Sequence, residues 1–71
     1  MKIILKDCTE PELNVFRNNC NFTDDEMRYF NLRAKGKSNI QISLDMDIST
    51  ATVSRLASRV QSKISRFLIN S

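Results

Sequence analysis

Apolar residues recur at helical spacing through the last third of the chain, and this pattern restricts the fold more than any other feature. After Ser49 they occupy positions 53, 56, 57, 60, 64, 67 and 68. Spacings of three and four residues place these side chains on one face of an α-helix. The pattern predicts a helix over residues 50–69, about 30 Å long at roughly 1.5 Å per residue. The apolar face of this helix is unusually clear.

Three more helices are predicted from their start signals. Each begins with Ser or Thr followed three residues later by Glu or Gln, a pair whose side chains bind each other's backbone amides. The pairs are Thr9 with Glu12, Thr23 with Glu26, and Ser38 with Gln41. They predict helices over residues 10–19, over residues 23–35 with Gly36 as the left-handed end residue, and from residue 38 to near residue 46.

The predicted inward faces follow from the same periodicity. In the helix over residues 10–19 the inward residues are Leu13, Phe16 and Cys20. In the helix over residues 23–35 they are Met27, Phe30 and Ala34, with Leu32 at the edge. Residues 1–6 fit either a short strand or a loose arm, and the sequence leaves this choice open.

The predicted fold class is all-α: a small three- to four-helix bundle with a helix-turn-helix and a long C-terminal helix. A chain of 71 residues forms one domain, divided here into an arm or strand (1–8), an accessory helix (9–20) and the helix-turn-helix (22–69). Cys8 and Cys20 form no CxxC pair and the chain has no histidine. We therefore expect reduced thiols, no metal site and no cofactor.

Several functional classes are disfavoured. The N-terminal apolar run is three residues long, too short for a secretion signal or a membrane span. We expect a soluble, cytoplasmic protein with no membrane partner. The chain also lacks a glycine-rich phosphate loop and a nucleophile motif, and its carboxylates stand at helix starts where capping explains them, so we expect no enzyme.

Charge is divided unevenly along the chain. Residues 1–26 carry three basic and six acidic side chains, whereas residues 27–71 carry eight basic and two acidic ones. This asymmetry indicates an anionic partner for the C-terminal half, with nucleic acid the commonest candidate. A solvated helix face explains the same charges equally well, so charge alone leaves both interpretations open.

The side chains between residues 42 and 56 favour a DNA-reading helix-turn-helix. In such a unit the first helix crosses closely over the second, which requires a small residue between apolar ones and a turn residue that tolerates positive φ. Ser43 is the small residue and Asp47 occupies the turn position usually given to glycine. The apolar residues of the unit are Ile42, Met46, Ile48, Val53 and Leu56.

This segment resembles the LuxR/GerE-type helix-turn-helix, and it is nearly as similar to the promoter-recognition domain (region 4) of bacterial sigma factors. The matching residues lie between Phe22 and about Ser65: Phe22-Thr23, Glu26, Ala34-Lys35-Gly36, Ser38-Asn39, Ile42, Asp47-Ile48-Ser49 and Thr52-Val53. The resemblance implies a DNA-binding regulator whose long helix enters the major groove. The chain departs from the LuxR pattern at Asp47 and in having no helix after the recognition helix, and the helix over residues 10–19 is expected to cover the open side instead.

Helix geometry predicts which side chains face DNA. The expected base contacts, at the start of the helix, are Ser49, Ala51, Ser54, Arg55 and Ser58. Arg55 is the only long donor among them, suited to pair with guanine O6 and N7. The expected phosphate contacts are Lys35, Lys37, Thr50, Thr52, Arg59 and Lys63. The solvated side of an amphipathic helix is the alternative explanation for Arg59, Lys63 and Arg66.

The sequence thus predicts a small transcriptional regulator that binds double-stranded DNA sequence-specifically. Because one such head binds weakly, a homodimer held by Ile64, Phe67 and Leu68 is a further hypothesis. The rival interpretation is a protein-binding module on the same fold, with RNA polymerase, a sigma factor or a nuclease as its partner.

Overall fold

The computed structural model describes residues 3–70, and within them the only regular elements are helices. They are the 3-10 helix η1 (Leu5–Asp7), α1 (Glu10–Asn19), α2 (Asp24–Ala34), α3 (Asn39–Met46) and α4 (Thr50–Asn70). The molecule is elongated, with principal extents of 34 × 21 × 20 Å. The predicted all-α class is confirmed. No helix within residues 3–70 is long and apolar enough to cross a membrane.

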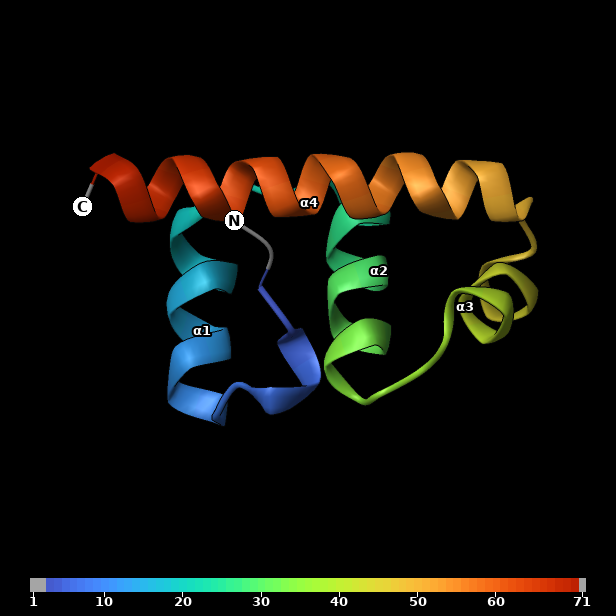
Figure 1. Ribbon diagram of the computed structural model, residues 1–71, viewed down its shortest axis with the longest axis horizontal. Coiled ribbons are helices and arrows are strands. Elements are labelled where there is room, and N and C mark those ends of the chain that lie inside the picture. The colour runs from blue at the N-terminus through green and yellow to red at the C-terminus, as the bar shows by residue number, and fades with distance from the viewer. Residues whose placement is uncertain (1–2, 71) are drawn as a thin grey trace.

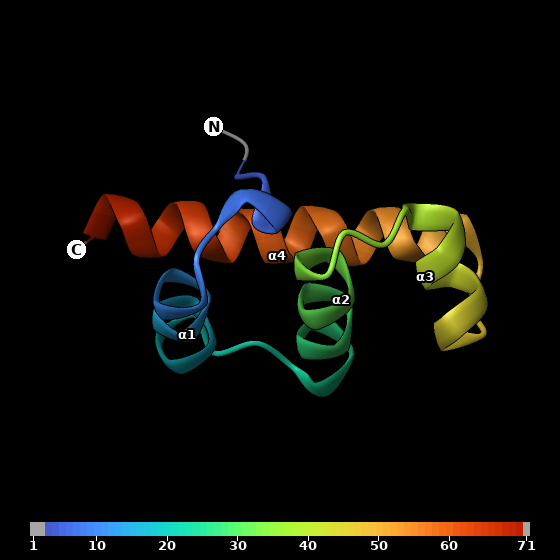
Figure 2. The same cartoon turned by 90° about the horizontal axis from the view of Figure 1, so that it is seen from below.

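Helix α4 runs the length of the molecule, and the other helices lie along one side of it (Figure 1). Helix α1 lies beneath its C-terminal half, α2 near its middle and α3 at its N-terminal end. Seen from below, the N-terminal segment lies beside the middle of α4 (Figure 2). There the Gln61 side chain binds both backbone groups of Ile3, accepting from its amide at 2.8 Å and donating to its carbonyl at 2.7 Å.

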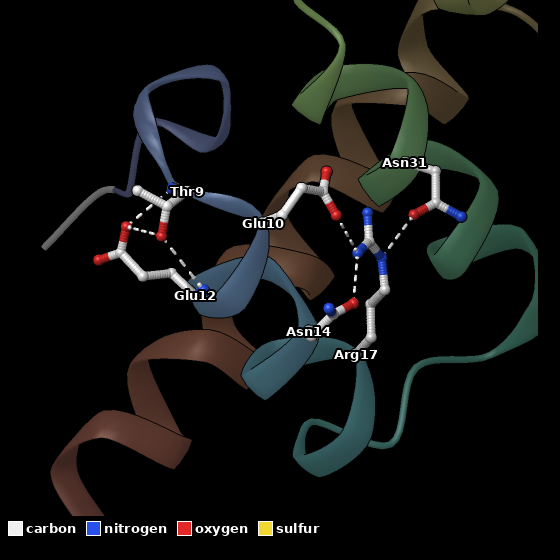
Figure 3. Close-up of polar contacts among 6 residues, drawn as sticks. All are labelled: Thr9, Glu10, Glu12, Asn14, Arg17 and Asn31. Carbon is white, nitrogen blue, oxygen red and sulfur yellow. Dashed lines mark hydrogen bonds and ion pairs between the residues drawn. The ribbon is translucent and has the colours of Figure 1, made fainter.

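The three predicted capping boxes are present. In α1, α2 and α3 the cap hydroxyl accepts from the third amide of the helix, and the third side chain accepts from the cap amide. Figure 3 shows the pair formed by Thr9 and Glu12. Gly36 follows α2 with φ of +90°, a backbone conformation that costs glycine little. The helix starts predicted from these capping pairs are confirmed, because capping depends only on neighbouring residues.

The buried face of α2 differs from the prediction. Phe30 is buried as predicted, but the other two buried residues are Glu26 and Tyr29, and Met27 and Ala34 are only partly buried. The face is rotated because α2 is covered by η1 on one side and by α4 on another. Leu5 of η1 is 2% exposed and belongs to the core. Residues 5–7 therefore form neither the strand nor the loose arm considered above.

Arg17 of α1 has partners both on its own helix and on α2. Its guanidinium donates to Asn31 Oδ1 at 2.9 Å and to Asn14 Oδ1 at 2.8 Å, and it lies 3.3 Å from Glu10 Oε2 (Figure 3). The same group lies over the Phe30 ring, 5.5 Å from its centre. The contacts with Asn31 and Phe30 join the accessory helix to α2.

The predicted dimer contact is wrong for Ile64. This side chain is fully buried inside its own chain because α1 covers the C-terminal half of α4. Phe67 makes an edge contact with Phe16 of α1, with ring centres 6.2 Å apart, and Leu68 is also packed against the core. Residues Leu13, Phe16 and Cys20 face inward as predicted. Both cysteines are free thiols.

Candidate nucleic-acid interface

Helices α3 and α4 form the crossing that the sequence predicts. Ser43 is 8% exposed, and its hydroxyl donates to the Ile40 carbonyl at 2.7 Å. Ile42 on α3 and Val53 on α4 are fully buried, so the apolar residues beside Ser43 meet the start of α4. The small side chain lets the two helices approach closely without leaving its hydroxyl unsatisfied.

The turn between the two helices rests on one left-handed residue. Asp47 has φ of 56° and ψ of 48°, as its place in the sequence predicts. The reversed backbone brings the Ile48 amide to the Ser43 carbonyl at 3.0 Å, which closes the end of α3. Helix α4 starts directly afterwards, where Ser49 Oγ accepts from the Thr52 amide at 3.1 Å.

The outward surface at the start of α4 is open to solvent. The residues on it are all exposed: Ser49, Thr50, Ala51, Ser54, Arg55 and Ser58. Arg55 makes no hydrogen bond and no ion pair with any residue in the described part of the chain. Its guanidinium is therefore available to an external acceptor. The hydroxyls of Ser49 and Thr52 lie 3.0 Å apart and serve the helix cap, which reduces their capacity for DNA.

The predicted phosphate contacts differ in their surroundings, and Lys63 is set apart from the others by its partners inside the fold. Lys35 and Lys37 lie in the connection between α2 and α3, and Thr50 and Arg59 are exposed on α4. Lys63 belongs to a different environment. Its ammonium pairs with the Glu26 carboxylate and donates to the Asn21 carbonyl at 3.1 Å. The Lys63 ammonium is thus engaged inside the fold, and its predicted contact with a DNA phosphate stays a prediction.

The pairing of Glu26 with Lys63 was missed from the sequence. The Glu26 side chain is only 3% exposed, and that of Lys63 is 29% exposed. Burial by itself raises the pKa of the Glu26 carboxyl, but the hydrogen bonds from Lys63 and from the Thr23 amide outweigh this effect and hold the pKa below its usual range. Glu26 therefore remains charged near neutral pH while it caps α2.

Residues 21–66 match the family described as bacterial regulatory proteins, luxR family (GerE). The chain belongs to this family. The match spans α2, α3 and most of α4, which are the helices that carry the exposed surface described above. A helix-turn-helix of the luxR family is the DNA-binding domain of a transcription regulator. No curated protein and no solved structure matches the chain.

The luxR-family match leaves residues 3–20 outside it. These residues form η1 and α1, which cover the middle and the C-terminal half of α4. Whether α1 takes the place of a further helix, as the sequence predicts, stays a prediction. Residues 3–20 therefore lie outside the luxR-type domain and pack against it.

Proposed function

We propose that this luxR-family domain binds double-stranded DNA sequence-specifically, with the first half of α4 in the major groove, and that it regulates transcription in this way. The observation that supports the proposal is the asymmetry of α4. Val53, Leu56 and Val60 are buried on one side, while the opposite side near the helix start is exposed and carries Arg55. A helix docked by its N-terminal half presents such a surface to base edges.

Arg55 is the principal base contact in this proposal. It is exposed and lacks any internal partner within residues 3–70, and its forked donors match O6 and N7 of guanine. Ser54 and Ser58 are short donors on either side of it, and Ala51 is placed to meet a thymine methyl group. Lys35, Lys37, Thr50 and Arg59 would bind phosphates and set the orientation of the helix without reading sequence.

The proposal is tested by selecting binding sites from a pool of random duplexes, with the natural chain and with Arg55→Ala. The natural chain is expected to enrich a site containing a preferred guanine. Arg55→Ala is expected to lose that preference, at a cost of about 1–3 kcal/mol, and to keep the others. Arg28→Ala, on the exposed side of α2, is the matched control. A preference unchanged by Arg55→Ala would overturn the assigned contact.

A protein partner is the second candidate function, and one observation favours it. Ile40 and Leu44 are 66% and 75% exposed, one helical turn apart on α3. Exposed aliphatic pairs of this kind are common in protein interfaces. If this pair is the main binding surface, Ile40→Ser with Leu44→Ser would abolish binding to RNA polymerase, a sigma factor or a nuclease while leaving the folded state intact. Unchanged binding to every such partner would remove this candidate.

A further inference from the structure

A pocket of about 340 Å³ lies between the N-terminal segment, α2, α3 and α4. Its apolar lining includes Leu5 and Ala57, and its polar lining includes Lys6, Tyr29 and Arg33. The polar lining contains two positive charges and no carboxylate. A pocket of this composition favours an anionic group.

Tyr29 places a buried hydroxyl, without a partner among residues 3–70, beside this pocket. The side chain is 4% exposed, and its hydroxyl binds no residue in the described part of the chain. No fully buried side-chain oxygen or nitrogen lacks a partner among the described residues. The Tyr29 hydroxyl must therefore retain contact with solvent, and the solvent space beside Tyr29 is this pocket.

The same hydroxyl is a hydrogen-bond donor at neutral pH. Burial raises the pKa of Tyr29, and the nearby positive charge of Arg33 opposes this only partly. Nη1 of Arg33 donates to the Lys37 carbonyl at 2.7 Å. The other N–H groups of this guanidinium have no acceptor among the described residues. A phenol donor beside a guanidinium and an ammonium suits the oxygen atoms of a phosphate.

The position of the pocket indicates where such a phosphate comes from. Ala57 and Gln61 line the pocket, and each lies three residues after a serine of the exposed α4 surface, Ser54 and Ser58 respectively. Residues three apart are neighbours on a helix. Asn39, in the first turn of α3, lines the pocket as well. The pocket therefore adjoins the surface that we propose enters the major groove.

We propose that this pocket receives a phosphate of the bound DNA duplex, with Lys6 and the Tyr29 hydroxyl as its ligands and Arg33 as a supporting charge. The inference rests on the proposed DNA-binding function and adds a contact from a segment outside the luxR-family match. The N-terminal segment then has two tasks. It completes the core through Leu5, and it holds Lys6 beside the duplex.

The test compares duplex binding by the natural chain, Lys6→Gln, Tyr29→Phe and the control Arg28→Gln. All are titrated against one labelled duplex over a range of salt concentrations. Lys6→Gln is expected to reduce the log-log salt slope by about 0.9, the value for one lost phosphate contact. Tyr29→Phe is expected to weaken binding about tenfold with the slope unchanged, because it removes a neutral donor to a charged acceptor. Arg28→Gln, outside the pocket, is expected to bind as the natural chain does.

Two further outcomes separate the possible failures. If the natural chain binds the duplex and Lys6→Gln and Tyr29→Phe bind it equally well, the inference is overturned and the proposed function stands. If the natural chain binds no duplex at all, the proposed function fails and this inference fails with it. A nuclear magnetic resonance titration with inorganic phosphate tests the alternative ligand, a free anion. Saturable shifts at Tyr29 and Gln61, together with no effect of Lys6→Gln on duplex binding, would assign the pocket to a free anion. That result would overturn the contact with the duplex.

Discussion

The Lys63 ammonium lies against the buried Glu26 carboxylate and joins the middle of α4 to the first turn of α2. The two residues are 37 positions apart in the chain. Glu26 also accepts from the Thr23 amide at 2.9 Å, so a single carboxylate both caps α2 and binds α4. This pair joins α2 to α4, the long helix of the helix-turn-helix.

Lys63→Met tests this pair. The substitution leaves the Glu26 charge buried without its partner, and we expect the free energy of unfolding to fall by about 3 kcal/mol, the lower end for such losses because Lys63 is partly exposed. Denaturant unfolding measures the change. Arg66→Met, one turn further along α4 and exposed, is the control and should unfold almost as the natural chain does.

The same variant separates two roles for Lys63. If the ammonium serves only the fold, the salt dependence of DNA binding by the remaining folded Lys63→Met protein should equal that of the natural chain. Arg59→Met, by contrast, should reduce the slope by about 0.9. A reduced slope for Lys63→Met would show that Lys63 also contacts a phosphate.

Stability should fall in acid because of Glu26. Its pKa is lower in the folded chain than its ordinary value of about 4.5. Above that ordinary value the carboxyl is charged in both states and its contribution to stability is complete. As the pH falls below about 4.5 the unfolded chain takes up the proton first, and the contribution is lost as the pH passes through the folded pKa.

Glu26→Gln makes this pH effect measurable. The difference in unfolding free energy between the natural chain and Glu26→Gln should be large at pH 7 and should shrink as the pH falls below about 4.5. Glu12 also has a lowered pKa, through its hydrogen bonds with Thr9, so Glu12→Gln is a control for an exposed cap. A difference that stays constant with pH would contradict the pairing.

Asp47 offers a test of the turn. A left-handed backbone costs most L-residues about 1–2 kcal/mol, and glycine avoids this cost but loses more chain entropy on folding. Asp47→Gly should therefore raise the free energy of unfolding by about 0.5 kcal/mol, whereas Asp47→Val should lower it by about 1 kcal/mol or more. Thermal unfolding of both variants gives the comparison. The opposite order of stabilities would contradict the left-handed conformation.

Local signals in the sequence predicted much of this fold. The starts of α1, α2 and α3 follow from capping pairs, and the turn at Asp47 follows from the few residues that adopt positive φ. Such features depend on atoms within a few residues of each other. The family was also recognisable from the sequence, because the residues that shape the crossing of α3 and α4 lie close together.

Contacts between distant segments were not predictable in the same way. Glu26 was fully explained as a cap, and nothing near it indicated Lys63. Ile64 had the spacing of a dimer seam as well as of a core, and only the position of α1 decides between them. Tyr29 belongs to the same buried core as Leu5 of η1, and the sequence left the structure of residues 1–6 open. These three residues were not predicted correctly for one reason: the burial of a helix face depends on which distant segment packs against it.

The most direct test of the central claim is a fluorescence anisotropy titration of the natural chain against a labelled random-sequence duplex at low and high salt. The account predicts binding at low salt that weakens steeply as salt rises, with a log-log slope of about −0.9 for each neutralised phosphate. Lys35, Lys37 and Arg59 are among the cations expected to set that slope, together with Lys6 if it binds a phosphate as inferred above. No binding at low salt would contradict DNA recognition by this domain and would favour a protein partner at Ile40 and Leu44.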